Sequence, residues 1–111
     1  MTEQLELVMY SRTMPCPYVT IARRTLQKLG VPYRELMIDE DDTYRARVLA
    51  WTGFLSVPTL IIARQGQDLP ISEPTPLPKG ASPRGVDRGP MLTEASEDEL
   101  TAWLRKHGFL P

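Results

Sequence analysis

The chain has 111 residues, of which 41% are hydrophobic and 24% charged, a balance that predicts one compact domain and argues against wholesale disorder. Its net charge is −1 and it has no basic run, so nothing favours a nucleic-acid partner. No stretch of about 18 apolar residues is present, so we expect no membrane-spanning segment.

The first half of the chain predicts alternating strands and helices. Short apolar runs such as LELVMYS are typical of buried strands, and apolar residues at spacings of three and four indicate amphipathic helices. Strands are expected at 5–11, 32–39 and 57–63, and helices at 17–29 and from the acidic run DEDD to about residue 51. The first strand, helix and second strand should form a right-handed parallel crossover.

The second half of the chain contains a long irregular segment. Residues 65–90 hold six prolines and four glycines, which exclude a regular ladder or helix there and predict a flexible insert. A short strand at 90–93 should return antiparallel to the strand before the insert. A helix at 96–108 follows, and Ser96 and Glu99 form a capping box at its start.

Cys16 is the only cysteine, and it lies between the first predicted strand and the first predicted helix. The free N–H groups and the dipole of a helix N-terminus stabilise a thiolate, which is the reactive form of cysteine. Pro17 suits the first helical position, and the sulfur is expected to accept from the N–H groups of Tyr18 and Val19. Arg12 adds positive charge nearby. This context favours a nucleophile over a cysteine that only fills the core.

Three stretches carry a resemblance to the glutaredoxins of the thioredoxin fold: LVMYSRTMPCPYV, LGVPYRELMIDED and TGFLSVPTLIIA. Many members of that family have Cys-Pro-Tyr-Cys after the first strand, Ile-Asp after the second and Thr-Val-Pro before the third. The resemblance covers roughly residues 5–63 in order. It implies an α/β thioredoxin-like fold, β-α-β-α-β-β-α, with a mixed four-stranded sheet, helices on both faces and the Pro/Gly-rich insert between the last two strands. Residues 1–111 would form a single domain.

The resemblance also assigns residues to a site. Cys16 would be the attacking cysteine, and the bond between Val57 and Pro58 would be the family's cis peptide, whose preceding backbone pairs with a bound thiol. Thr93 and Glu94 stand near the place of a Gly-Gly-Ser-Asp-like segment that holds the γ-glutamyl end of glutathione. The expected thiol-binding residues are Arg12, Pro17, Tyr18, Val57, Pro58, Thr93 and Glu94.

Three features depart from the family pattern. Val19 occupies the position of the second cysteine, so internal dithiol chemistry is impossible. Arg12 lies four residues before the cysteine, whereas the family's cationic residue is usually three before it. The Gly-Gly-Ser-Asp-like segment is absent, and the chain has Thr93, Glu94 and Ala95 there.

The sequence therefore predicts a monothiol glutaredoxin-type oxidoreductase that maintains redox homeostasis. Its co-substrate would be glutathione or an equivalent low-molecular-weight thiol such as mycothiol or bacillithiol, and its partners would be oxidised or thiolated proteins. We expect a cytoplasmic protein, because a single free cysteine without a secretory signal is typical of a reducing compartment, and we expect a monomer. No metal is expected, because the acidic run DEDD suits helix capping better than calcium binding. Two alternatives stay open. One is a dimeric module that binds a [2Fe–2S] cluster with glutathione, and the other is a non-catalytic domain that binds a partner.

Overall fold

The computed structural model describes residues 4–111 and contains seven regular elements within that range. In chain order they are β1 (Leu5–Ser11), α1 (Pro17–Leu29), β2 (Tyr33–Met37), α2 (Asp42–Thr52), β3 (Thr59–Arg64), β4 (Met91–Thr93) and α3 (Glu97–Lys106). The predicted order of elements is confirmed. The second and third strands are shorter or shifted by one to two residues at their ends.

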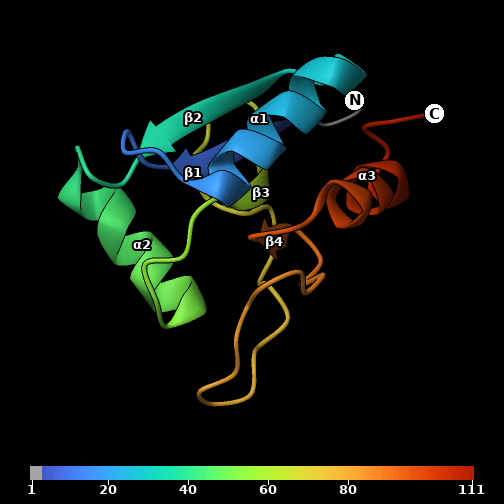
Figure 1. The fold of residues 1–111 in the computed structure, drawn as a ribbon. Coiled ribbons are helices and arrows are strands. Elements are labelled where there is room, and N and C mark those ends of the chain that lie inside the picture. The colour runs from blue at the N-terminus through green and yellow to red at the C-terminus, as the bar shows by residue number, and fades with distance from the viewer. Residues whose placement is uncertain (1–3) are drawn as a thin grey trace.

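The strands form one mixed four-stranded sheet in the order β2-β1-β3-β4. β1 runs parallel to β2 and antiparallel to β3, and β3 runs antiparallel to β4 (Figure 1). The predicted thioredoxin-like arrangement is therefore correct. The crossover from β1 to β2 through α1 places the start of α1, with Cys16, beside the edge where β1 ends and β3 begins.

Both faces of the sheet are covered, because alternate residues of the buried strands point to opposite sides. Leu7 and Met9 of β1 belong to a core shared with α1 and α3, whereas Val8 and Tyr10 belong to a second core that includes Val48 of α2. Figure 1 accordingly shows α1 and α3 together on one side of the sheet and α2 on the other.

The helix ends follow from local chemistry. The Asp41 carboxylate accepts from the backbone N–H groups of Thr43 and Tyr44 and caps α2. Ser96 and Glu99 make the predicted capping box at the start of α3. These caps fix the residues at which α2 and α3 begin. The start of α3 in turn fixes the position of the short β4–α3 connection, which borders the site.

Residues 65–90 form the predicted irregular insert between β3 and β4, and in Figure 1 they extend away from the sheet as a long loop. Arg88, with only 6% of its surface exposed, holds the end of this loop to the body. Its guanidinium donates to the backbone oxygens of Thr75, at 2.8 Å, and Trp51, at 2.7 Å. The loop is thus anchored at its base, and its flexibility stays a prediction.

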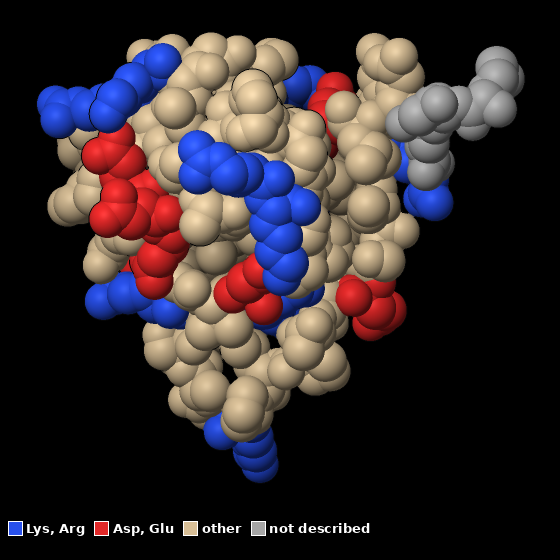
Figure 2. Space-filling view, turned by 90° about the vertical axis from the view of Figure 1, so that its right-hand side faces the viewer, with Lys and Arg blue, Asp and Glu red and all other residues tan. Residues whose placement is uncertain are grey.

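Charged side chains of both signs are interleaved on the face of the molecule shown in Figure 2, which carries no extended region of one sign. Among residues 4–111, no helix has the length and apolar character needed to cross a lipid bilayer.

Candidate active site

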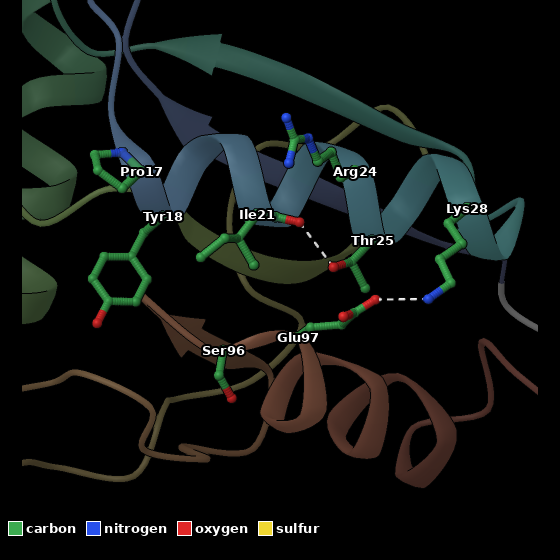
Figure 3. Close-up of a pocket in the computed structure, with 8 residues that line it drawn as sticks. All are labelled: Pro17, Tyr18, Ile21, Arg24, Thr25, Lys28, Ser96 and Glu97. Atoms are coloured by element: carbon green, nitrogen blue, oxygen red, sulfur yellow. Dashed lines mark hydrogen bonds and ion pairs between the residues drawn. The ribbon is translucent and has the colours of Figure 1, made fainter.

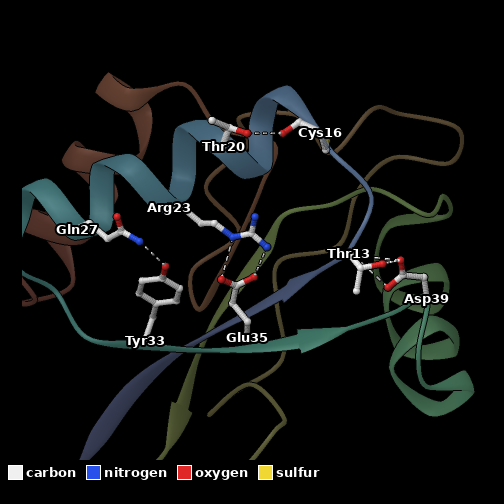
Figure 4. A network of polar contacts seen from close by, with 8 residues as sticks. All are labelled: Thr13, Cys16, Thr20, Arg23, Gln27, Tyr33, Glu35 and Asp39. Carbon is white, nitrogen blue, oxygen red and sulfur yellow. Dashed lines mark hydrogen bonds and ion pairs between the residues drawn. The ribbon is translucent and has the colours of Figure 1, made fainter.

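Cys16 is the N-cap residue of α1, directly after the loop that leaves β1. Its backbone is extended, with φ −149° and ψ 126°, and Pro17 begins the helix, as its missing N–H allows. The Cys16 carbonyl accepts from the Thr20 N–H at 3.0 Å and from the Thr20 hydroxyl at 3.2 Å (Figure 4). The first turn of the helix thus fixes the backbone that carries the thiol.

The thiol lies beside the segment that precedes β3. Its Sγ lies 3.8 Å from the backbone oxygen of Val57, and the side chain makes no capping hydrogen bond. The expectation that the sulfur accepts from the N–H groups of Tyr18 and Val19 is therefore wrong. The side chain packs instead beside Val57, against the core on the α2 side of the sheet. The Val57–Pro58 peptide bond is cis, as predicted.

A small cavity of about 210 Å³ opens at the thiol. Its lining is Arg12, Cys16, Phe54, Leu55, Ser56, Val57 and Glu94. Four of these residues were predicted from the sequence. The cavity combines a guanidinium, a carboxylate and the Val57 backbone around one sulfur, so it can hold a small polar thiol.

Arg12 brings positive charge into this cavity. One terminal nitrogen of its guanidinium donates weakly to the Pro15 oxygen at 3.4 Å. Its Nε is buried and has no hydrogen-bond partner within residues 4–111. A buried guanidinium nitrogen without a partner is costly in the free protein.

The loop from β1 to Cys16 is held to the end of β2 by Asp39. The Asp39 carboxylate accepts from the backbone N–H of Thr13 at 3.0 and 3.1 Å and also from its hydroxyl (Figure 4). The hydrogen bond from the Thr13 side chain is the main reason that the pKa of Asp39 is lowered. This contact orients the segment that carries Arg12.

Not all predicted residues meet at the cavity. Pro17 and Tyr18 line a larger groove of about 720 Å³ between α1 and α3 (Figure 3). Thr93 is fully buried in β4, and its hydroxyl lies 3.0 Å from that of Thr59. The Pro58 oxygen accepts from the Glu94 N–H at 2.9 Å and so joins the cis-proline segment to the β4–α3 connection.

Sequence reasoning missed Arg84, which reaches the site from the insert. Its guanidinium forms a 2.9 Å ion pair with Glu94 and lies over the Tyr18 ring, with 4.9 Å from Cζ to the ring centroid. It also missed Phe54, Leu55 and Ser56 in the cavity lining. These three directly precede Val57 in the chain, so their position was a usable signal. No such signal existed for Arg84.

Comparison with known proteins adds a family and a fold. The family model described as Glutaredoxin matches residues 7–66, more than half of the chain. A buckwheat glutaredoxin in complex with glutathione is 22% identical, with 96% of this chain and 73% of that chain covered and a TM-score of 0.52. The holo form of glutaredoxin C1 from Populus tremula x tremuloides is 26% identical over 49% of this chain and 55% of that chain, with a TM-score of 0.42. No curated protein matches significantly. The buckwheat protein shares the fold of nearly all of this chain.

Proposed function

The chain belongs to the glutaredoxin family, and from this premise we propose that it is a monothiol thiol–disulfide oxidoreductase with Cys16 as the attacking residue. The single thiol at the start of α1, open to a cavity and 3.8 Å from the Val57 oxygen, carries the proposal. The thiolate is the reactive form of cysteine, and the cavity gives a disulfide access to this sulfur.

The proposed substrate is a mixed disulfide between a protein and a low-molecular-weight thiol. The Cys16 thiolate attacks the sulfur of the small thiol, and a bond forms between these two sulfurs. The protein–sulfur bond to the small thiol breaks, and the protein thiolate leaves and takes a proton from solvent. The protein is reduced, and Cys16 is left disulfide-bonded to the small thiol.

The second step requires another molecule of the small thiol. Its thiolate attacks the small-thiol sulfur of the adduct, which releases a symmetrical disulfide and returns Cys16 as a thiolate. An internal route is closed, because Val19 stands where a resolving cysteine would be and is buried, with 1% of its surface exposed. A monothiol enzyme of this kind therefore depends on a second small-thiol molecule to release Cys16.

We propose glutathione, or an equivalent thiol built on a cysteine amide, as the co-substrate. The Val57 oxygen beside Sγ is placed to accept the amide N–H of that cysteine, and the Arg12 guanidinium can take a carboxylate. Glutathione is the molecule bound in the buckwheat protein. The protein would act as a monomer in the cytoplasm on thiolated proteins.

The test is a deglutathionylation assay with the purified protein. A glutathionylated peptide and reduced glutathione are supplied, and release of the peptide thiol is followed for the wild type and for Cys16→Ser. We expect turnover only in the wild type. Mass spectrometry after treatment with glutathione disulfide should show a single glutathionyl adduct on Cys16.

Two results would contradict the proposal. One is full activity in Cys16→Ser, because the chain has no other thiol. The other is a brown protein with an iron–sulfur absorbance as isolated and no disulfide exchange, which would favour the cluster-binding alternative.

A further inference from the structure

The groove of about 720 Å³ between α1 and α3 begins next to the nucleophile. Pro17 and Tyr18, which directly follow Cys16 in the chain, lie at one end of the groove, and Lys28 and Glu97 lie at the other (Figure 3). The groove and the cavity at Cys16 have no lining residue in common. The groove is therefore a second surface, separate from the cavity in which a small thiol would react.

The walls of the groove are apolar near the thiol and charged farther away. Tyr18 and Ile21 are half-buried and point from α1 toward α3 (Figure 3). Thr25 adds no free donor, because its hydroxyl donates to the Ile21 oxygen at 2.8 Å. At the far end the Lys28 ammonium donates to the Glu97 carboxylate at 3.0 Å, and this ion pair joins the two helices. An apolar strip that starts at the thiol and ends at charged groups is suited to an extended chain.

The charge left over on the groove is positive. Three cations of α1 and α3 form ion pairs: Arg23 with Glu35, Lys28 with Glu97, and Lys106 with Asp87 of the insert. Arg24 also lines the groove and is exposed, but it makes no ion pair with any residue of 4–111. A carboxylate that lies in the groove would therefore find a free guanidinium at its rim.

The dimensions of α1 set the spacing that a bound chain needs. An α-helix rises about 1.5 Å per residue, so Ile21 lies about 7 Å and Arg24 about 12 Å along the helix from Cys16. An extended chain advances about 3.3 Å per residue. A chain that starts at Cys16 and follows the groove would place its second residue near Ile21 and its fourth near Arg24.

We propose that the groove binds the protein half of the mixed-disulfide substrate as an extended segment. The segment carries an apolar side chain two residues from its cysteine and an acidic side chain four residues from it. The apolar side chain packs against Tyr18 and Ile21, and the carboxylate pairs with the Arg24 guanidinium. This inference rests on the proposed function and deepens it, because it states which thiolated proteins are preferred.

The experiment compares glutathionylated peptides with one central cysteine. The first peptide has valine two residues and glutamate four residues from the cysteine on both sides, because the groove does not fix the direction of the chain. The second has lysine in place of glutamate, and the third has glycine in place of valine. The ratio of kcat/KM between two peptides is taken within each protein, so a change in the chemical step cancels.

The proteins are the wild type, Arg24→Glu, Ile21→Ser and Arg45→Glu. Arg45 is the matched control, because it is an exposed arginine of α2, which lies on the other side of the sheet (Figure 1). Arg45→Glu therefore makes the same change of net charge away from the groove.

We expect the wild type to prefer the glutamate peptide over the lysine peptide about three- to fivefold, the effect of an exposed ion pair, and to lose this preference at high salt. Arg24→Glu should reverse the preference, and Arg45→Glu should keep it. The wild type should also prefer the valine peptide over the glycine peptide about three- to tenfold, because part of the valine is buried. Ile21→Ser should remove most of that difference.

Three results would overturn the docking site. They are a wild type without either preference, an Arg24→Glu protein or an Ile21→Ser protein with unchanged ratios, and an Arg45→Glu protein that reverses as Arg24→Glu does. The mixed disulfide of free cysteine and glutathione has no flanking residues and tests the proposed function separately. Its turnover by the wild type leaves the proposed function intact whatever the peptides show, whereas a wild type that turns over none of these substrates overturns both.

Discussion

Arg88 is expected to be the main anchor of the insert, and replacing it with methionine tests this. The guanidinium is buried and donates to the oxygens of Thr75 and Trp51 at 2.8 and 2.7 Å. It therefore links the far part of the insert to the end of α2. Methionine has a similar length and fills much of the same volume, so Arg88→Met removes the hydrogen bonds with little change in packing.

The size of the effect follows from two opposing contributions. A hydrogen bond from a charged donor is worth about 1.5–3 kcal/mol, so two such bonds contribute about 3–6 kcal/mol. Burying the guanidinium opposes this, and the same desolvation lowers the pKa of Arg88. Thr75 is exposed, so water can replace part of its contact. We expect Arg88→Met to lower the free energy of unfolding by about 2 kcal/mol and Tm by about 8 °C.

Urea unfolding followed by circular dichroism measures this change, with Lys106→Met as the control for an exposed contact of the insert. The control should lose no more than about 0.5 kcal/mol. Amide exchange at Thr75, whose N–H donates to the Arg88 oxygen, should also become faster in Arg88→Met. A loss equal to that of the control, with unchanged exchange at Thr75, would refute the anchoring role.

Four further predictions concern the site and the insert. Val19→Cys should form a disulfide with Cys16 that dithiothreitol reverses and should gain dithiol reductase activity, as mass spectrometry and an insulin reduction assay would show; a variant that stays fully reduced under oxidant would contradict this. Arg12→Ala should slow alkylation of Cys16 by iodoacetamide about two- to threefold at neutral pH, because a cation on the cavity wall favours the thiolate, whereas Arg24→Ala should not; equal rates in all three proteins would contradict it. The pKa of Asp39 is lowered in the folded protein, so the ionised Asp39 carboxylate stabilises the fold above the unfolded pKa of about 3.9, and this stabilisation is lost as pH falls through the lower folded pKa. Asp39→Asn should therefore flatten the dependence of the urea midpoint on pH in that acidic range. The amides of Leu77, Lys79, Gly80 and Ser82, which donate to no backbone oxygen, should exchange fastest among residues 65–90, and slow exchange there would mean that the tip of the insert is packed.

Whether a feature of the candidate site could be predicted from the sequence depends on how far apart in the chain its interacting residues lie. The strand and helix positions, the capping box of Ser96 and Glu99, and the place of Cys16 at a helix start depend on neighbouring residues, and the sequence alone predicted them. The grouping of Arg12, Cys16 and Val57 was also foreseen, although through a family resemblance and not through periodicity. Local propensity acts over a few residues, so these features are written in short stretches of sequence.

What depends on long-range packing was decided only by the tertiary structure. The contact of the Cys16 thiol with the Val57 oxygen follows from how the segment before β3 lies beside the start of α1. The insert has no periodic pattern, so nothing local indicated that Arg84 returns to Glu94. That path is set by the backbone bridge between Arg84 and Thr93 of β4 and by Gly85, which has a positive φ and lies against Glu99 of α3. Both contacts exist only after the sheet and the helices have come together.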